Sequence, residues 1–437
     1  MAWPIDMQPR LRDLQTTLTR HEGNAYIVLR DPLGMSEEMI LVPQALAPLL
    51  GLCDGSRDLA TLRTAFELRT GISLRSTVLE QLIHRLDEAL LLDNERFAQA
   101  HDAALSEFRA APARPPVLAG RSYPADPGEL KDMIKGYLSS SQRVESRRGG
   151  LGTPDPGLRT REGDSGLQTP DPGLRTIDGL ITPHIDFQRG SAVYAHVWGS
   201  AARTIQDTEL AIIFGTDHLD GRNLFTLTKQ HYSTPWGTLP TAGDMVDRVA
   251  DALGRDIAFE DELHHRNEHS IELAAVWLHY FLGARGCELL PILCSSFTQF
   301  MLGDNDPLND EQIAAMIDSL RAITRSRRTL LIAAVDLAHM GPAFGDRYPI
   351  DAIERARVTA ADERLIQAMC AADADGFFAQ IKRERNRRRI CGMAPIYLTL
   401  RLLDGARGKA LGYMQCPADA TGASLVSICG VVLGDRG

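Results

Sequence analysis

Histidines and aspartates recur directly after apolar segments in the second half of the sequence. Three segments, GLIT, ELAIIFG and TLLIAAV, are followed by His184 and Asp186, by Asp217 and His218, and by Asp336 and His339. Imidazole and carboxylate groups can hold a metal ion or transfer protons. One histidine after a strand is ordinarily a loop or capping residue, but three ends that carry both residue types are hard to explain by packing. The recurrence indicates a metal or acid–base site.

Two further segments supply side chains of the same kinds. NEHSIELAAVWLHYFL begins with Glu268 and His269 and continues as a helix, and its spacing of His269 and Glu272 is weak evidence for a metal by itself. RRRICGMAPIYLTLRLL places Cys391 and Gly392 before another helix. Because a helix N-terminus and basic neighbours favour a thiolate, Cys391 is the best candidate for ligation or reactivity among the seven cysteines.

The elements that carry these residues indicate an α/β fold. Apolar runs of strand length alternate with helical stretches such as SAVYAHVWGSAA and ADERLIQAMCAADADGFFAQI. Continuous apolar strands are typical of a largely parallel sheet that helices cover on both faces. Such sheets bind ligands where the strands give way to loops at their carboxyl ends. We therefore expect the polar residues to meet at one edge of the sheet.

Composition restricts the classes of partner. The 437 residues carry a formal net charge of −10, which disfavours nucleic acid and anionic membranes as partners; the basic run KRERNRRR is read as a solvated helix face or loop. No leader pattern begins the sequence, and no apolar run approaches the roughly 18 residues that span a bilayer. The seven cysteines lack paired spacing, and four of them lie in apolar settings typical of a core: Cys53, Cys294, Cys370 and Cys429. We expect reduced thiols and a cytoplasmic protein.

The chain divides into two predicted domains. We expect a small domain over residues 1–100, a linker over 101–120 and the α/β domain over 121–437. Within the α/β domain, residues 143–176 contain the near-duplicates LGTPDPGLRT and LQTPDPGLRT and few large apolar residues, which predicts a disordered insert. Before this insert, Asp126 as N-cap, Pro127 and Glu129 begin a helix whose apolar stripe should pack on the α/β domain.

The small domain is predicted to be α+β and winged-helix-like. AYIVLR and MILVP are extended, and apolar residues then recur at helical spacing from Leu46 to Leu90. LCDGSRDLATLRTAF followed by VLEQLIHRLDEALLLDN resembles the PqqD-like family of small winged-helix peptide chaperones. The resemblance implies a domain that presents a peptide or docks a radical enzyme. The alternative is a structural or dimerising appendage.

Six segments of the larger domain resemble the Memo family. RSYPADPGEL, TPHIDFQRG, FGTDH, NEHSIEL, VDLAHMG and CGMAPIYL occur in the order seen in that family, and the domain is similar to the B component of AmmeMemoRadiSam systems. The resemblance implies a fold like that of the class III extradiol dioxygenases, in which two histidines and a carboxylate hold Fe(II). It also implies that His184, His218 and Cys391 are the metal ligands, and that Asp336 and His339 line the cleft. The role of Asp186, an additional carboxylate, is left unassigned.

The resemblance also shapes the expected chemistry. Two imidazoles and a thiolate form a softer site than two imidazoles and a carboxylate, so iron, copper and zinc are comparably suited to it. His269, His339 and Asp336 are the candidate catalytic residues beside an open coordination position. We expect a metal-dependent redox or oxygenase-type enzyme of unknown substrate.

Two alternatives to this enzyme remain open. The first is a peptide- or protein-binding module that works with a radical SAM enzyme and an AMMECR1-like protein, with a small molecule or peptide in the cleft. The second is a metallohydrolase, because zinc with two histidines and a thiolate can activate water, although no nucleophile elbow or HExxH motif supports it.

Overall fold

The computed structural model describes residues 8–148, 174–303 and 305–435, which fold as two compact units, Met1–Ala111 and Pro112–Gly437. Residues 95–110 form helix α4 (Glu95–Ala110), so much of the expected linker is helical, and residues 112–120 belong to the second unit. Helix α5 (Pro127–Arg148) continues past position 143, where we expected the insert to begin. Most of that expected insert, residues 149–173, lies outside the described part of the chain.

The first unit combines a three-stranded antiparallel sheet with helices. The sheet has the order β1 (Gln15–His21), β2 (Asn24–Arg30) and β3 (Ile40–Pro43), and its helices are α1 (Ala47–Leu50), α2 (Leu59–Thr70), α3 (Ser76–Glu88) and α4. The two extended segments expected from the sequence are β2 and β3. Their residues Leu29, Ile40 and Val42 enter a core with Phe66 and Ile83. The relation of this unit to PqqD-like domains stays a prediction.

The second unit is built on an eight-stranded sheet. Its central strands are β4 (Gly179–Thr182), β10 (Thr329–Ala334), β5 (Leu210–Thr216) and β9 (Glu288–Cys294), which are parallel and adjacent in that order. Antiparallel partners flank them: β13 (Leu425–Gly434) beside β4, and β6 (Phe225–Leu227) beside β9. Strands β11 (His339–Met340) and β12 (Arg407–Pro417) both pair with β13. The largely parallel sheet expected from the sequence is confirmed.

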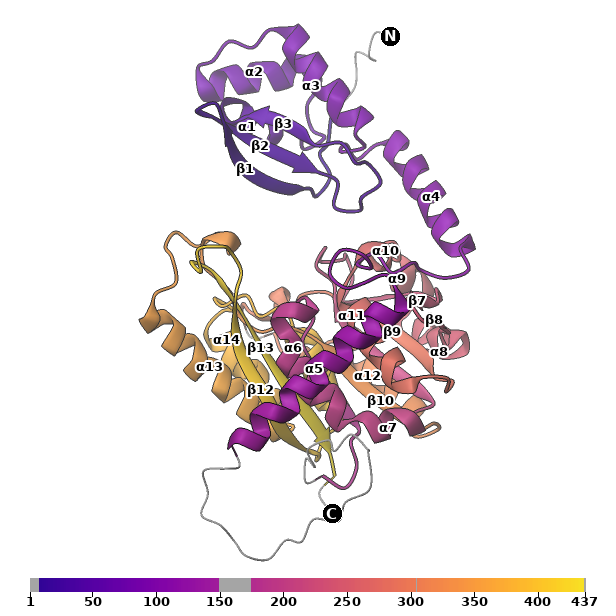
Figure 1. Ribbon diagram of the computed structural model, residues 1–437. Coiled ribbons are helices and arrows are strands. Elements are labelled where there is room, and N and C mark those ends of the chain that lie inside the picture. The colour runs from indigo at the N-terminus through magenta and orange to yellow at the C-terminus, as the bar shows by residue number, and fades with distance from the viewer. Residues whose placement is uncertain (1–7, 149–173, 304, 436–437) are drawn as a thin grey trace, which may run out of the picture. The chain divides into compact units, whose positions relative to one another are not determined.

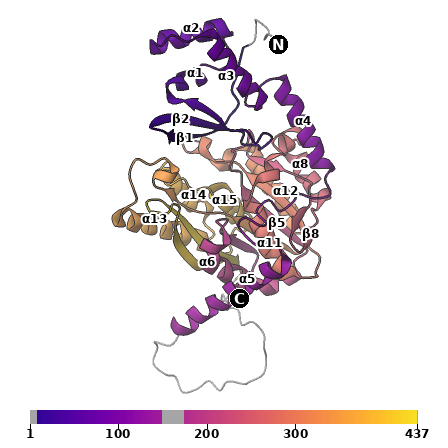
Figure 2. The same ribbon diagram turned by 45° about the horizontal axis from the view of Figure 1, so that its top comes forward.

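Helices cover both faces of this sheet (Figures 1 and 2). One face carries α6 (Phe187–Ser200) and α11 (Ser270–Leu282), with α5 packed outside α6 and α7 (Ala202–Asp207) packed on α11. The other layer contains α8 (Gly243–Leu253), α12 (Glu311–Thr324), α13 (Ala352–Cys370), α14 (Ala374–Arg383) and α15 (Met393–Leu402). Two apolar cores result, one on each side of the sheet, because every residue of β5 is buried and its side chains alternate between them.

Short elements complete the unit between β6 and α11. They are the hairpin of β7 (Tyr232–Thr234) and β8 (Gly237–Leu239), and helices α9 (Arg255–Phe259) and α10 (His264–Asn267). The start of α5 matches its predicted cap, since Asp126 Oδ1 accepts from the backbone N–H groups of Gly128 and Glu129 at 2.8 and 2.9 Å. Its Leu130 and Ile134 are fully buried against the unit.

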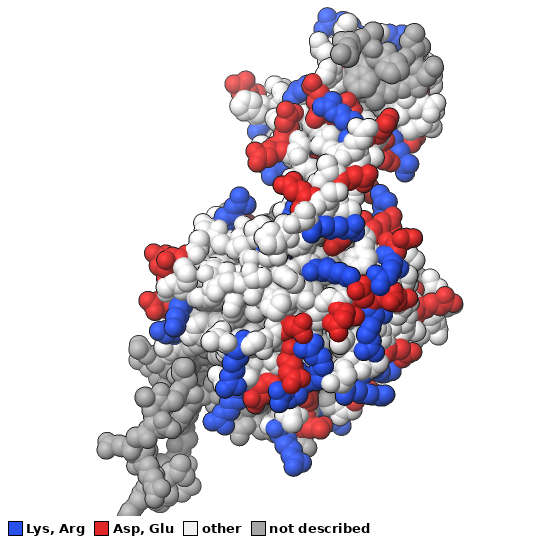
Figure 3. All heavy atoms as spheres, turned by 90° about the vertical axis from the view of Figure 1, so that its right-hand side faces the viewer, with Lys and Arg blue, Asp and Glu red and all other residues white. Residues whose placement is uncertain are grey.

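One face of the larger unit mixes charges of both signs. On the face seen in Figure 3, lysine and arginine side chains alternate with aspartate and glutamate side chains and do not gather into one field. Within the described residues, no helix has both the length and the apolarity needed to cross a bilayer.

Candidate metal centre

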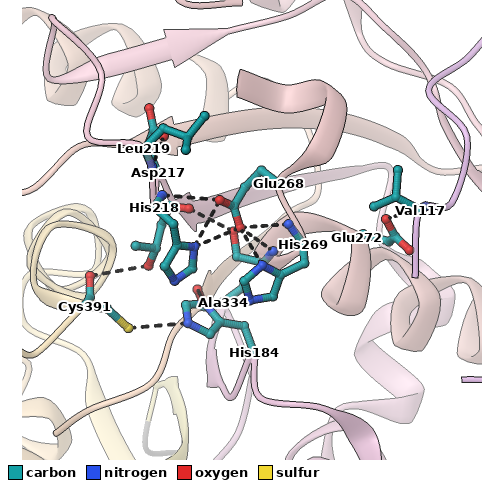
Figure 4. A network of polar contacts seen from close by, with 12 residues as sticks. Val117, His184, Asp217, His218, Leu219, Glu268, His269, Glu272, Ala334 and Cys391 are labelled. Carbon is teal, nitrogen blue, oxygen red and sulfur yellow. Dashed lines mark hydrogen bonds and ion pairs between the residues drawn. The ribbon is translucent and has the colours of Figure 1, made fainter. Parts of the chain in front are cut away.

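The carboxyl ends of the central strands bring three histidines together (Figure 4). His184 follows β4, His218 follows β5, and His269 immediately precedes α11. One ring nitrogen from each lies within 4.8 Å of the others, a spacing at which the three can share one metal ion. The ring centroids of His184 and His218 are 4.9 Å apart, and those of His218 and His269 are 4.7 Å apart.

Sheet order explains how residues far apart in sequence meet here. Strands β4 and β5 flank β10 and run parallel to it, so their last residues reach the same edge. Helix α11 approaches this edge because Gly215 in β5 has no side chain: a Cβ there would lie 2.5 Å from Ser270 Oγ. The Ser270 hydroxyl instead donates to the carbonyl of Thr216 at 3.2 Å, which fixes His269 beside the strand end.

Each of these imidazoles has an acceptor on its Nδ1 side. The Nδ1 atom of His184 lies 3.0 Å from the carbonyl of Ala334, and that of His218 lies 3.0 and 3.1 Å from the two Glu268 oxygens. Glu268 also lies 3.2 Å from Nδ1 of His269. Acceptors of this kind hold the proton on Nδ1 and leave Nε2 to bind a metal, which is the arrangement commonly found around metal-ligating histidines.

Glu268 is therefore the residue that orients two of the three imidazoles, those of His218 and His269. Its carboxylate is buried and also accepts from the backbone N–H groups of His269 and Ser270 at 2.8 and 2.9 Å. Burial acts to raise the pKa of Glu268, but His218 outweighs it and holds this pKa well below its ordinary value. Burial likewise acts to lower the pKa of His218, and Glu268 together with Cys391 raises it well above the ordinary value.

Cys391 lies beside the three histidines. Its Sγ is 3.4 Å from Nε2 of His184 and 3.4 Å from the carbonyl oxygen of Asp336. This position depends on Gly392, where a Cβ would lie 2.5 Å from Cβ of Val335, the residue that follows β10. The thiol can therefore reach an ion held by the cluster, although whether it serves as a ligand stays a prediction.

The expectation that basic neighbours favour the Cys391 thiolate is wrong. Burial raises the pKa of Cys391 above its ordinary value, and the contact with His218 opposes this only in part. The preceding arginines are neutralised elsewhere: Arg387 pairs with Glu354, Arg388 with Asp362, and Arg389 with Asp346. Their charge is thus directed away from the thiol.

Asp336 and His339 follow β10 but occupy different surroundings. Asp336 accepts from the backbone N–H of His184 at 3.0 Å, and its other oxygen lies 3.7 Å from His184 Nε2. Burial raises the pKa of Asp336 to about 7. His339 lies outside the three-histidine group; its Nδ1 faces the carbonyl of Leu337 at 3.1 Å, and burial lowers its pKa to about 4. Their catalytic roles stay predictions.

Other acidic residues singled out from the sequence have structural partners. Asp186 caps α6 by accepting from the backbone N–H of Arg189 at 3.0 Å, which accounts for this carboxylate. Asp217 accepts from Nδ1 of His264 at 2.8 Å. Glu272 does not face the cluster, so the spacing of His269 and Glu272 does not form a metal-binding pair.

Glu272 instead belongs to a buried network that the sequence did not reveal. It pairs with Arg114 at 2.7 Å and accepts from the Tyr123 hydroxyl at 2.6 Å. The Arg114 guanidinium donates further to the carbonyls of His265 and Glu268, at 2.6 and 2.5 Å. Arg114 thus anchors the segment that carries Glu268, and its only sequence signal was a lone arginine in an apolar stretch that we assigned to a linker.

The donor set suits a transition metal ion. Neutral imidazoles bind zinc, copper and iron, and a nearby thiol adds a softer donor. Burial lowers the pKa of His184 well below its ordinary value, with His218 and His269 contributing, so this imidazole is neutral and available as a ligand. The residues therefore fit a bound metal, and a buried cluster of His184, His218 and His269 could hold one.

Fold and site together define an α/β protein with a histidine-rich centre at the carboxyl edge of its sheet. The chain belongs to the Memo family, as a family model described as Memo-like protein matches residues 114–432. A MEMO1 family protein of Aquifex aeolicus is 28% identical over 435 residues, covering 98% of this chain and 100% of the relative. MEMO1 family proteins of Methanosarcina acetivorans and Methanopyrus kandleri are 29% and 25% identical, covering 54% and 69% of this chain and 77% and 91% of those relatives.

Proposed function

We propose that the protein is a mononuclear metalloenzyme with redox or oxygenase-type chemistry. The observation that carries the proposal is the convergence of three imidazoles, each with an outer acceptor, on a point within reach of the Cys391 thiol. A bound transition metal would supply Lewis acidity or electron transfer there. The chain itself supplies the ligands, orients them through Glu268 and Ala334, and offers Asp336 and His339 as proton-transfer groups near the substrate.

His184 and His218 are the proposed fixed ligands, because both follow parallel strands of the sheet. The third ligand is either His269, from the start of α11, or Cys391, from the loop before α15. Iron, copper and zinc are the candidate ions. The thiolate favours a softer ion such as Cu(I), whereas a third imidazole also suits Zn(II) and Fe(II).

Metal content of the intact protein tests this assignment. After anaerobic loading with Fe(II), Cu(I) or Zn(II), we expect one ion per chain in the natural protein and loss of the ion in His184→Ala and His218→Ala. The variant His279→Ala, at the other end of α11, is the matched histidine control and should keep the ion. Unchanged metal in both ligand variants would refute the site.

Spectroscopy of the Co(II)-loaded protein identifies the third ligand. A sulfur-to-cobalt charge-transfer band that disappears in Cys391→Ala and persists in His269→Ala would assign the thiolate, and its absence from the natural protein would assign His269. The reaction class is tested separately by oxygen uptake of the Fe(II)-loaded protein with candidate small-molecule and peptide substrates. Uptake that His184→Ala does not reduce would contradict the oxygenase proposal.

The first unit favours a second candidate function, a module that works with protein partners. The Aquifex aeolicus relative aligns with 98% of this chain and so extends through this unit. The match to the Methanopyrus kandleri relative uses only 69% of this chain but covers 91% of the relative. Little of that relative is left that could correspond to the first unit. The unit is therefore separable from the metal centre in evolution, as expected of a docking domain.

We propose a radical SAM enzyme and an AMMECR1-like protein as those partners, in the manner of AmmeMemoRadiSam systems. Size-exclusion chromatography of the intact chain with each purified partner tests this candidate. The Leu41→Arg variant, which alters a side chain of β3 that is 44% exposed, should weaken any complex made through the first unit. Co-elution that is absent for both partners would refute it.

A further inference from the structure

A cavity lies on the face of the larger unit that carries α5, α6, α7 and α11. Its volume is about 510 Å³, within the range of roughly 300–1,000 Å³ that is usual for small-molecule sites. His269 stands at the start of α11, whereas His279 and Tyr280 line the cavity near the other end of that helix. At a rise of about 1.5 Å per residue, this separation along the helix is about 15 Å. The cavity is therefore distinct from the metal centre.

One wall of the cavity is aromatic and held in place. It consists of Trp236 from the turn between β7 and β8 and of Tyr280 and Phe281 from α11. The Trp236 indole donates to the carbonyl of Pro127 at 3.0 Å and lies 6.0 Å from the Tyr280 ring. His279 Nδ1 lies 2.7 Å from the hydroxyl of Thr234, which ties the hairpin to α11. The wall is thus formed before any ligand binds.

Small residues form another part of the lining. Ala195 and Gly199 of α6 and Ala202 of α7 line the cavity at the point where longer side chains would occupy it. Leu138 of α5 closes the apolar lining. The small and the aromatic residues together give the cavity an apolar lining that suits a planar ring.

Two cations that line the cavity have no carboxylate partner among the described residues. Lys131 of α5 and Arg203 of α7 are exposed, and the described residues provide an ion pair for neither of them. By contrast, Arg285, which does not line the cavity, lies 3.7 Å from Asp207. Unpaired cations beside an apolar cavity attract anions and can form charge-assisted hydrogen bonds with them.

We propose that this cavity binds a small aromatic anion, a planar ring system that carries one carboxylate, sulfonate or phosphate group. The ring stacks against Trp236, Tyr280 and Phe281, where offset stacking and edge-to-face contacts are favourable. The acidic group meets Arg203 and Lys131. The site requires no metal ion and does not depend on the proposed redox function.

Two fluorescent probes of the same shape test the charge requirement on the intact protein. Anilinonaphthalene sulfonate carries an acidic group, and phenylnaphthylamine is its uncharged counterpart. Because hydrogen bonds to charged groups contribute about 1.5–3 kcal/mol, Arg203→Gln should weaken sulfonate binding about tenfold or more and leave phenylnaphthylamine unaffected. Arg285→Gln is the matched control and should change neither affinity. Equal weakening of both probes by Arg203→Gln would overturn the proposal.

A cavity-filling variant tests the location. Ala202→Trp should abolish the binding of both probes, whereas Thr204→Trp on the same helix, which does not line the cavity, should leave it intact. Circular dichroism and the melting temperature establish that each variant is folded. Sulfonate binding that survives in folded Ala202→Trp would show that the probe binds elsewhere and would overturn the proposal. Should Ala202→Trp fail to fold, Lys131→Gln on the surface of α5 tests the same site, and undiminished binding would again overturn it.

Discussion

Replacing Arg114 by methionine should be among the most destabilising single changes in the second unit. The guanidinium is fully buried and donates to Glu272 and to the carbonyls of Pro115, His265 and Glu268. Methionine has a similar length but no donor, so it leaves those carbonyls unsatisfied and the Glu272 carboxylate without its cation. Breaking a buried ion pair costs about 3–5 kcal/mol, and typical domains have a total stability of only about 5–15 kcal/mol.

Denaturant unfolding followed by tryptophan fluorescence measures this cost. Three of the four tryptophans, Trp198, Trp236 and Trp277, lie in the second unit and report on it. We expect Arg114→Met to lower the free energy of unfolding by about 4 kcal/mol. Because the same guanidinium holds the carbonyl of Glu268, metal affinity should also fall, by about tenfold, as is usual for losses around metal ligands.

A double-mutant cycle separates the pair from the rest of the network. Glu272→Gln removes the negative charge but keeps a side chain of the same shape, whose amide oxygen can still accept from the Tyr123 hydroxyl. If the ion pair accounts for the cost, adding Glu272→Gln to Arg114→Met should lower the free energy of unfolding by at most about 1 kcal/mol more, because the effects of coupled sites do not add. A cost of Arg114→Met below about 1 kcal/mol, or strictly additive losses, would refute this account of the network.

Three further predictions follow from the same contacts. Glu268→Gln should lower metal affinity about 10- to 100-fold, measured by chelator competition, because two ligand imidazoles lose their charged acceptor. His265 is buried, donates to the Thr226 carbonyl and has a pKa lowered to about 4. The neutral imidazole therefore stabilises the fold fully above pH 6.5, and this contribution is lost as the pH falls toward 4. The stability advantage over His265→Asn should then shrink by about 3 kcal/mol between pH 7 and 4 in denaturation experiments. Gly392→Ala should weaken metal binding and cost about 1–3 kcal/mol through its collision with the residue that follows β10, whereas Gly243→Ala, in open space, should be nearly neutral.

Each of these three has a result that contradicts it. Metal affinity that Glu268→Gln leaves unchanged would mean that the carboxylate does not orient the ligands. A constant difference between the natural protein and His265→Asn at all pH values would mean that the imidazole titrates normally. Equal stability of the two glycine variants would mean that the loop before α15 can move away from β10 without cost.

The central strands could be predicted because their burial on both faces leaves a continuous apolar run in the sequence. Strand β9 was missed, since Pro291 lies in its middle and proline ordinarily argues against a central strand. The structure accommodates it because β6 pairs only with Ile292, Leu293 and Cys294 and ends before Pro291. Strand β1 was missed for a different reason: it is an exposed edge strand without apolar alternation.

The sequence predicted the location of a site residue only where that residue directly follows a strand of the parallel sheet. His184 and His218 follow parallel strands, so their meeting at one edge follows from sheet topology. We assigned His269 an acid–base role, and its spacing from Glu272 was only weak evidence for a metal. Its position within the cluster required knowledge of how closely α11 approaches β5. The network of Arg114 and Glu272 joins residues 158 positions apart, and no local pattern signals such a pair.

The choice of third ligand follows from how the two helix layers meet the sheet edge. His184 and His218 follow strands, whereas His269 and Cys391 lie at the starts of helices on opposite faces of the sheet. Gly215 lets the start of α11 approach the strand ends, and Gly392 does the same for the loop before α15. The His269 imidazole has its Nδ1 3.2 Å from the Glu268 carboxylate, whereas burial keeps the Cys391 thiol protonated until an ion displaces its proton. The raised pKa of His218 means that this ligand gives up a proton in either case. Binding through Cys391 should therefore release one proton more than binding through His269, and its affinity should rise more steeply with pH. The proton release measured during metal binding by calorimetry in buffers of different ionisation enthalpy thus distinguishes the two ligands, and release that Cys391→Ser leaves unchanged would exclude the thiolate.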